Sequence, residues 1–243
     1  MAHRLAVVIL HYGAVDLTAR LRDQLRASDP TWPDLFVLDN NAPEPFAEAW
    51  ERLPQNRYWA GALDHAARRL GNEGFSHLWF LNNDIRFVSR PPFLAMAWGR
   101  LQRLERTLGR VGVYSPSALQ NPYHPQMVQD PRRQYRRVRC VDGIAPLLNL
   151  ECLRARGLDY DGNAYGYGVD VAMTMAAHDA GWPVVVDHQV CVKHAYHTTA
   201  NAVPGFMDAA RDAEAAYMRR VLGHDWRDLV AQAQTDFTDH DAM

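Results

Sequence analysis

The sequence lacks the features that mark several classes of protein. No apolar run in its 243 residues approaches the roughly 20 residues that cross a bilayer, and the N-terminus has no signal-peptide cleavage pattern. Cys140, Cys152 and Cys191 are too few and too irregularly spaced for a disulfide framework or a zinc site. We therefore expect a cytoplasmic protein without a transmembrane segment.

A strong imbalance of charge is missing as well. The net charge is −2, which gives no sign of a nucleic-acid-binding surface. The local exception is a basic run that comprises Arg132, Arg133, Arg136, Arg137 and Arg139. Three explanations of this run stay open: a solvated surface, contact with a diphosphate or an anionic acceptor, and peripheral contact with a membrane.

Two common nucleotide-binding motifs are also missing. No glycine-rich loop of the dinucleotide-binding type follows the first apolar run, and no GxxxxGK[ST] sequence occurs. The sequence therefore lacks the motif on which each of two functions depends: hydride transfer with a dinucleotide cofactor, and P-loop nucleotide chemistry.

The pattern that is present alternates buried strands with amphipathic helices. Apolar runs at 5–10, 35–38 and 77–81 predict strands covered on both faces, and the spacing of apolar residues predicts helices between and after them. This alternation is typical of an α/β protein with a mainly parallel sheet flanked by helices. We expect a single domain over 1–243, with a nucleotide-binding half at 5–110, an acceptor-binding and catalytic half at 111–200, and a C-terminal helix and tail at 205–243.

Several finer elements are expected as well. The first half is predicted to hold a short helix from Pro45 through Trp50 and Leu53 and a brief strand at 57–59. In the second half we predict a long loop at 115–137, a strand at 138–141, a helix at 147–156, a glycine-rich loop at 162–168, a helix at 169–180, strands at 184–186 and 190–192, a helix at 209–222 and a frayed tail after Thr235.

Polar clusters follow three of the first four predicted strands. They are His11-Tyr12-Gly13, Asp39-Asn40-Asn41 and Asn82-Asn83-Asp84. Any one of them is explained by ordinary turn formation. Together they predict a binding site, because ligands of open parallel sheets bind beyond the carboxyl ends of the strands.

These clusters also carry a resemblance to a known family. Val8-Ile9-Leu10-His11-Tyr12-Gly13, Leu38-Asp39-Asn40-Asn41, the stretch from Asn56 to Asp64, and Leu81-Asn82-Asn83-Asp84 follow one another as the motifs of family 2 glycosyltransferases do. The chain resembles the rhamnosyltransferase-like group of that family, which has the GT-A fold. The resemblance implies an inverting transfer of a sugar from a nucleoside-diphosphate sugar to the hydroxyl of a carbohydrate or lipid-linked acceptor.

The second half adds further motifs to this resemblance, with two departures. Gly157-Leu158-Asp159, the stretch from Tyr167 to Ala172, Ala180-Gly181-Trp182 and Val192-Lys193-His194 keep the order of the family's later motifs. However, Val169 and Ala172 stand where the family usually has Glu and Asp. These departures keep a second interpretation open, a catalytically degenerate nucleotide-sugar-binding protein. A GT-A-like nucleotidyltransferase is a weaker third, since no glycine-rich basic loop follows the first strand.

The resemblance assigns roles to particular residues. Asp170 is the expected catalytic base, which takes the proton of the attacking hydroxyl. Its alternative role is that of an acidic residue in the first turn of a helix. Asp84 and His194 are the expected ligands of a divalent metal, Mn²⁺ or Mg²⁺, and His197 is a further histidine three residues on.

The donor nucleotide and sugar are expected to contact residues from all three polar clusters and from the following helix. These residues are His11, Tyr12, Gly13, Asp39, Asn41, Asp64, Asn82 and Asn83. A solvated position on a helix is the alternative for Asp64. Among the tryptophans, Trp182 is the best candidate for stacking on a sugar, and Trp59, Trp79 and Trp98 are expected in the core.

Overall fold

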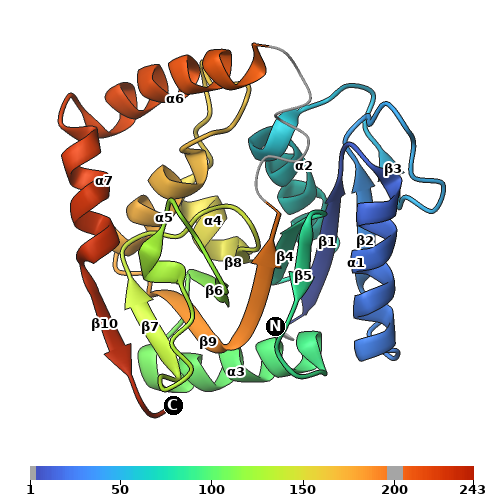
Figure 1. The fold of residues 1–243 in the computed structure, drawn as a ribbon, viewed down its shortest axis with the longest axis horizontal. Coiled ribbons are helices and arrows are strands. Elements are labelled where there is room, and N and C mark those ends of the chain that lie inside the picture. Colours follow the sequence, from blue (N-terminus) through green and yellow to red (C-terminus); the bar gives the residue numbers. More distant parts are fainter. Residues whose placement is uncertain (1–3, 196–204) are drawn as a thin grey trace.

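A computed structural model describes residues 4–195 and 205–243. The described residues form one sheet of ten strands, in which nine follow the order β10-β7-β9-β6-β8-β4-β1-β2-β3 and β5 pairs with β9 (Figure 1). The strands are β1 (Leu5–His11), β2 (Leu35–Asp39), β3 (Glu51–Arg52), β4 (His77–Asn82), β5 (Ile85–Phe87), β6 (Val113–Ala118), β7 (Tyr135–Val138), β8 (Leu147–Asn149), β9 (Val184–His194) and β10 (Phe237–His240).

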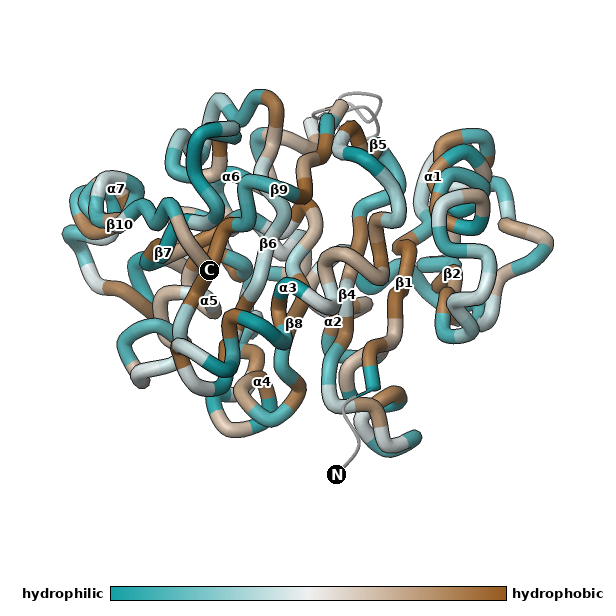
Figure 2. The backbone as a smooth tube through the Cα atoms, turned by 90° about the horizontal axis from the view of Figure 1, so that it is seen from below, coloured by the Kyte–Doolittle hydropathy of each residue, from teal (hydrophilic) through white to brown (hydrophobic). Residues whose placement is uncertain are grey.

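The first half of the chain forms the parallel part of the sheet. β1 lies between β2 and β4 and runs parallel to both, with His11 opposite Asp39 and Leu10 opposite Asn82. The strand ends that carry the polar clusters therefore lie at one edge, and the predicted α/β class is confirmed. Figure 2 shows apolar residues along β1, whose seven residues are all buried.

Helices cover both faces of this sheet (Figure 1). Helices α1 (Val15–Ser28) and α3 (Phe93–Leu108) contact each other and pack on one side, whereas α2 (Tyr58–Asn72), α4 (Leu150–Arg156) and α5 (Val169–Asp179) pack on the other. Helices α6 (Phe206–Leu222) and α7 (Trp226–Thr235) follow β9, and α6 packs on α5. Among the described residues, no helix has both the length and the apolar character needed to cross a membrane.

Two expectations for residues 45–59 are wrong, and side chains after β2 explain why. No helix forms at Pro45, because the Asp39 carboxylate accepts hydrogen bonds from the backbone N–H groups of Ala42 and Phe46 and fixes a loop there. No strand forms at 57–59, where α2 begins at Tyr58. The side-chain oxygen of Asn40 accepts from the Arg57 N–H and sets this start.

The second half holds more strand than its sequence predicts. The expected loop at 115–137 contains most of β6, the short 3₁₀ helix η1 (Pro125–Met127) and the start of β7, which ends at Val138 and does not extend to Val141. The expected helix at 147–156 begins as β8, and Asn149 then caps α4 through the N–H groups of Glu151 and Cys152. The two strands expected at 184–192 are one continuous strand, β9.

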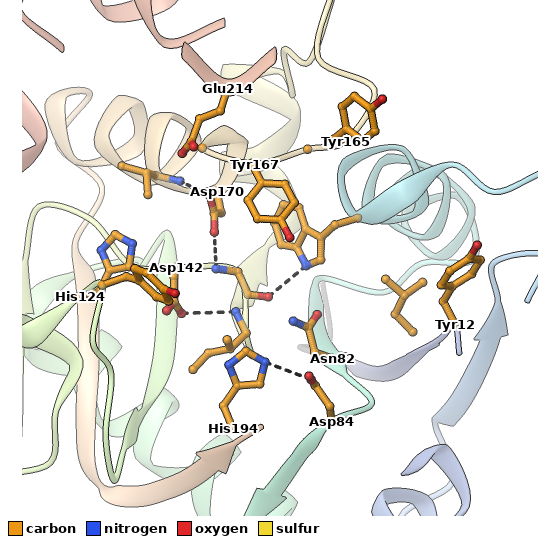
Figure 3. A pocket seen from close by; sticks show the side chains of 18 of the residues that line it. Tyr12, Asn82, Asp84, His124, Asp142, Tyr165, Tyr167, Asp170, His194 and Glu214 are labelled. Carbon is orange, nitrogen blue, oxygen red and sulfur yellow. Dashed lines mark hydrogen bonds and ion pairs between the residues drawn. The ribbon is translucent and has the colours of Figure 1, made fainter. Parts of the chain in front are cut away.

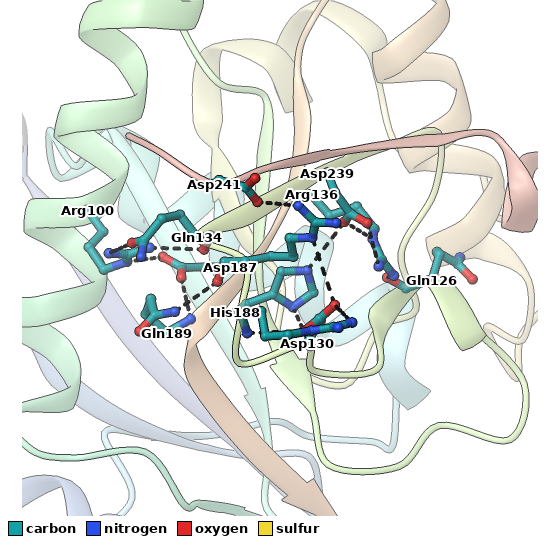
Figure 4. Close-up of polar contacts among 12 residues, drawn as sticks. Arg100, Gln126, Asp130, Gln134, Arg136, Asp187, His188, Gln189, Asp239 and Asp241 are labelled. Carbon is teal, nitrogen blue, oxygen red and sulfur yellow. Dashed lines mark hydrogen bonds and ion pairs between the residues drawn. The ribbon is translucent and has the colours of Figure 1, made fainter.

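The predicted frayed tail is also wrong, because residues 237–240 form β10 against β7. The basic run holds this strand in place (Figure 4). Arg136 is 8% exposed, donates to both oxygens of Asp239 at 2.7 and 3.2 Å, and lies 4.0 Å from the centroid of the Phe237 ring. Arg133 pairs with Asp241, which follows β10. Arg133 and Arg136 therefore stabilise the sheet edge, whereas Arg139 pairs with Asp179 of α5.

We expect Arg136→Ala to lower the free energy of unfolding by roughly 2 kcal/mol, because it removes charge-assisted hydrogen bonds to Asp239 and to the carbonyl of Gln126. Chemical denaturation measures this change. Arg137→Ala is the matched control: Arg137 is exposed on the opposite face of β7, so its loss should stay within about 0.5 kcal/mol. Equal effects of the two changes would contradict this account of the tail.

Candidate functional site

A cavity of about 450 Å³ lies at the carboxyl ends of β1 and β4 (Figure 3). Both halves of the chain contribute to it. The polar and aromatic residues that line it are Tyr12, Trp59, Asn82, Asn83, Asp84, Tyr123, His124, Asp142, Tyr165, Tyr167, Asp170, His194, Arg211 and Glu214. The cavity thus collects six of the eleven residues predicted for the site: Tyr12, Asn82, Asn83, Asp84, Asp170 and His194.

One wall of the cavity holds a carboxylate from the first half of the sequence and an imidazole from the second half. Asp84 precedes β5 and His194 ends β9, and these two strands pair antiparallel. The Ala195 N–H donates to the Asp84 carbonyl at 3.1 Å, and His194 Nε2 lies 3.0 Å from Asp84 Oδ1. The Asp84 side chain is 12% exposed and the His194 side chain is 9% exposed. Strand pairing therefore brings together two residues 110 positions apart.

This pair has the chemistry of a partial metal site. A carboxylate oxygen and an imidazole nitrogen are ordinary ligands of Mn²⁺, and both line the cavity. Within residues 4–195 and 205–243, no group of three or more His, Cys, Asp or Glu side chains is placed to hold a metal ion. The two residues fit an ion that completes its coordination with phosphate oxygens and water. His197 lies outside the described residues.

Asp170 occupies another wall, in the first turn of α5. Its Oδ1 accepts from the Val171 N–H at 2.9 Å, and its Oδ2 accepts from the Gly143 N–H at 2.5 Å. Burial raises the pKa of Asp170 to about 6, with a further contribution from the negative charge of Asp142; His124 and the two backbone hydrogen bonds act in the opposite sense. The carboxylate can therefore take up a proton near neutral pH.

Gly143 connects Asp170 to the tryptophan on the other side of the cavity. Its N–H donates to Asp170, and its carbonyl accepts from Trp59 Nε1 at 3.0 Å (Figure 3). A Cβ atom at this position would lie 2.7 Å from the Trp59 ring and 3.0 Å from Asp170 Oδ2. Only glycine fits here without displacing one of them.

The sequence did not single out several residues of this cavity. Asp142 follows β7 and precedes Gly143, and a polar loop after a strand is a signal that could have identified it. His124 precedes η1 and Glu214 lies on α6; nothing in their local sequence distinguishes them. Trp59, expected in the core, lines the cavity, whereas Trp79 is fully buried as expected.

His11, the last residue of β1, lies outside the cavity lining and supports it through a hydrogen-bond network. His11 is fully buried, with Nδ1 bonded to Thr18 Oγ1 at 2.7 Å and Nε2 to the carbonyl of Glu44 at 2.9 Å. Asn83 donates to the same Thr18 hydroxyl at 3.0 Å and to the Tyr12 carbonyl at 3.2 Å. This network fixes Tyr12, which does line the cavity.

The other predicted nucleotide contacts also lie outside the cavity lining. Both oxygens of Asp39 accept hydrogen bonds within the protein, and Oδ2 is 2.7 Å from Arg52 Nη1. Arg52 also donates to Asn41, and Gly13 has a φ of +90° just beyond β1. Asp64 pairs with Arg68 in a groove beside α2. Their contacts with a nucleotide stay predictions.

Trp182, the expected sugar platform, also lies elsewhere. The guanidinium of Arg110 is 5.1 Å from the centroid of its ring, and a Cβ atom on Gly112 would lie 2.7 Å from its own Cβ. It lines a separate small pocket with Arg137 and Arg139. Trp59 is the tryptophan placed to meet a ligand of the main cavity.

The two departures from the family motif have a packing explanation. Val169 and Ala172 are buried in an apolar cluster with Tyr217 and Met218 of α6. A carboxylate at either position would enter that cluster, where an unpaired charge is costly. The packing of α6 on α5 therefore accounts for apolar residues on both sides of Asp170.

Comparisons of the sequence with known proteins find relatives without an established function. No family model matches the chain. Uncharacterized proteins of Mycobacterium bovis and Mycobacterium tuberculosis are 29% identical to it over 199 residues, which cover 79% of this chain and 76% of theirs.

Three solved structures share its architecture at low identity. A mannosyltransferase from Pyrobaculum calidifontis, in complex with GDP-Man and Mn²⁺, has a TM-score of 0.58 and 16% identity over 96% of this chain and 75% of its own. GalNAc-T7 with UDP, GalNAc and Mn²⁺ has a TM-score of 0.57 and 12% identity over 80% of this chain and 44% of its own. A197 from STIV has a TM-score of 0.51 and 13% identity over 79% of this chain and 85% of its own. This chain thus has the GT-A fold.

We expect Gly143→Ala to destabilise the protein by roughly 1–3 kcal/mol, because the added methyl group overlaps the Trp59 ring and forces the loop away from Asp170. Thermal unfolding and the fluorescence of Trp59 measure the two effects. Gly99→Ala is the control. Gly99 is a solvent-exposed residue in the middle of α3, and nothing lies within 4 Å of an added Cβ there. That change should stabilise by up to about 1 kcal/mol. A stable Gly143→Ala protein with unchanged fluorescence would contradict the steric account.

Proposed function

We propose that this protein is an inverting glycosyltransferase of the family 2, rhamnosyltransferase-like type. It moves a sugar from a nucleoside-diphosphate sugar to a hydroxyl group of a carbohydrate or lipid-linked acceptor. The observation that carries the proposal is the shared cavity: the Asp84–His194 pair and the partly buried Asp170 line it together. The solved structures with GDP-Man or with UDP, both with Mn²⁺, support it through their common fold.

The wall with Asp84 and His194 suits the diphosphate of the donor. In this proposal these two residues would hold a divalent metal, Mn²⁺ or Mg²⁺, whose positive charge would offset the negative charge of the leaving nucleoside diphosphate. Asn82 lies beside Asp84, and Tyr12 lines the same cavity; both can orient the sugar or ribose through hydrogen bonds. The Asn83 side chain holds Tyr12 in place by donating a hydrogen bond to the Tyr12 backbone carbonyl.

The wall with Asp170 suits the acceptor. Inversion requires one displacement at the anomeric carbon, in which the acceptor hydroxyl loses its proton as it attacks. The Asp170 carboxylate accepts hydrogen bonds from two backbone N–H groups and lines the cavity, and burial raises its pKa to about 6. A base of this strength takes a proton efficiently near neutral pH. Sugar and acceptor would meet between the two walls.

A nucleotide-sugar-binding protein without turnover is the competing interpretation, since Val169 and Ala172 replace carboxylates. The cavity supports a working enzyme because Asp142 and Glu214 bring two other carboxyl groups to it from different elements. The nucleotidyltransferase interpretation gains no support, because the turn after β1 is short and lacks a basic glycine-rich loop.

The metal assignment predicts that Asp84→Asn weakens the Mn²⁺-dependent part of nucleoside-diphosphate binding while the fold is kept. Isothermal titration calorimetry with UDP and GDP, with Mn²⁺ and with a chelator, measures it. His194→Ala should change affinity in the same direction, and by less. If the wild type binds equally well with metal and with chelator, the assignment is wrong.

The base assignment predicts that Asp170→Asn lowers turnover by about 10²-fold or more, equivalent to roughly 3 kcal/mol of barrier, and keeps nucleotide affinity. For the wild type, kcat/KM should be high above pH 6 and fall as the pH drops through about 6, because protonated Asp170 cannot act as a base. Rates of sugar transfer, or of Mn²⁺-supported hydrolysis of UDP- and GDP-sugars, test both.

Asp159→Asn is the matched control, since Asp159 lies outside the cavity lining and pairs with Arg220 at 2.7 Å. It should leave turnover near the wild-type value. Transfer by Asp170→Asn at the wild-type rate would refute the catalytic role and leave Asp170 as an acidic residue of the first helical turn.

A further inference from the structure

The loop before β8 brings a second carboxylate close to Asp170. Asp142 is 8% exposed and lines the same cavity. Its Oδ2 accepts from Asn121 Nδ2 at 2.6 Å, and its Oδ1 accepts from the Ile144 N–H at 3.4 Å. Two donors from different segments therefore fix both of its oxygens.

The same loop bonds directly to Asp170. The N–H of Gly143, the residue after Asp142, donates to Asp170 Oδ2. Trp59 holds the carbonyl of that glycine on its other side. Because these contacts fix the peptide that joins Asp142 to Gly143, they fix both carboxylates relative to each other (Figure 3).

Several titratable groups surround Asp170, and Asp142 exerts the largest effect among the charges that raise its pKa. His124 acts against it. Titratable side chains that interact with Asp170 come from four segments of the chain: His124, Cys140, Asp142, Tyr167, Glu214 and Tyr217. The pKa of Glu214 is raised by burial and then by Asp170 itself, and Arg227 and Arg211 oppose this shift.

We propose that Asp142 is a positioning residue for Asp170: its loop holds Gly143 against the Asp170 carboxylate and places a second negative charge beside it. This charge comes from the β7–β8 loop because positions 169 and 172 face the apolar cluster under α6. As a like charge nearby makes a carboxylate more basic, Asp142 strengthens Asp170 as a proton acceptor. The catalytic part of this inference rests on the proposed function; the electrostatic part does not.

The test is the titration of Asp170 itself, followed by carbon NMR of the protein labelled at its aspartate carboxyl carbons. The signal that disappears in Asp170→Asn identifies the residue. In Asp142→Asn, which keeps the shape of the side chain, the pKa of Asp170 should fall by roughly half a unit or more. An unchanged Asp170 titration in this variant would overturn the inference.

Two further variants sharpen the result. His124→Gln removes the opposing charge, so the pKa of Asp170 should rise; a shift of both variants in one direction would contradict an electrostatic origin. If Asp142→Asn does not fold, as judged by circular dichroism, Asp142→Ser replaces it. This change also removes the negative charge and keeps a polar side chain, so the pKa of Asp170 should again fall.

Kinetics separate this inference from the proposed function. With UDP- and GDP-sugars and Mn²⁺, the acidic limb of the hydrolysis profile of Asp142→Asn should move to lower pH together with the NMR titration. A moved titration with an unmoved limb would overturn the role of Asp142 in the reaction. Absence of hydrolysis and transfer in the wild type would count against the proposed function, while a shifted NMR titration would still support the link between the two carboxylates.

Discussion

Strand β9 and its buried ion pair join the two halves of this molecule. Asp187, fully buried in β9, accepts from Arg100 Nε of α3 at 2.5 Å and from the Tyr114 hydroxyl of β6 at 2.8 Å (Figure 4). β9 also pairs with β5, β6 and β7. The position of its last residue, His194, is thereby set, and with it the contact with Asp84. Together with the pairing of β4 and β8, β9 therefore places residues of the second half beside those of the parallel half at the cavity.

The parallel half could be predicted from sequence because β1, β2 and β4 each consist mainly of a continuous run of apolar residues. The strand at 5–10 and the helix with Leu21 and Leu25 are found as expected. Prediction failed where distant contacts decide. The tail forms β10 because Arg136 binds Asp239, and no periodicity within residues 236–243 signals a partner 103 positions away. Likewise, the loop after β2 is set by the Asp39 carboxylate and not by the local preference for helix after Pro45.

Residues of the candidate cavity could be predicted where their motifs lie at the ends of strands or at the start of α5. Asn82, Asp84, Asp170 and His194 meet in one cavity, although the sequence separates them by up to 112 residues. The missing members, Asp142 and Glu214, come from a loop and from a helix whose positions depend on tertiary packing. In the sequence motif, Val169 suggests that a carboxylate has been lost. In the structure, Val169 packs against α6, and other elements supply the carboxylates Asp142 and Glu214 near Asp170. The sequence around Asp170 alone therefore underestimates the negative charge near it.

Strand β10 also decides how the sheet ends. A strand at an open edge presents unsatisfied N–H and C=O groups to any other strand, including one from another copy of the chain. β10 is four residues long and carries Asp239, so it makes a short and charged edge. β7, which it covers, is held to it by main-chain pairing and by the bonds of Arg136 to Asp239. Proteolysis before Phe237 would therefore leave the main-chain groups of β7 without these partners and would leave Arg136 without its carboxylate.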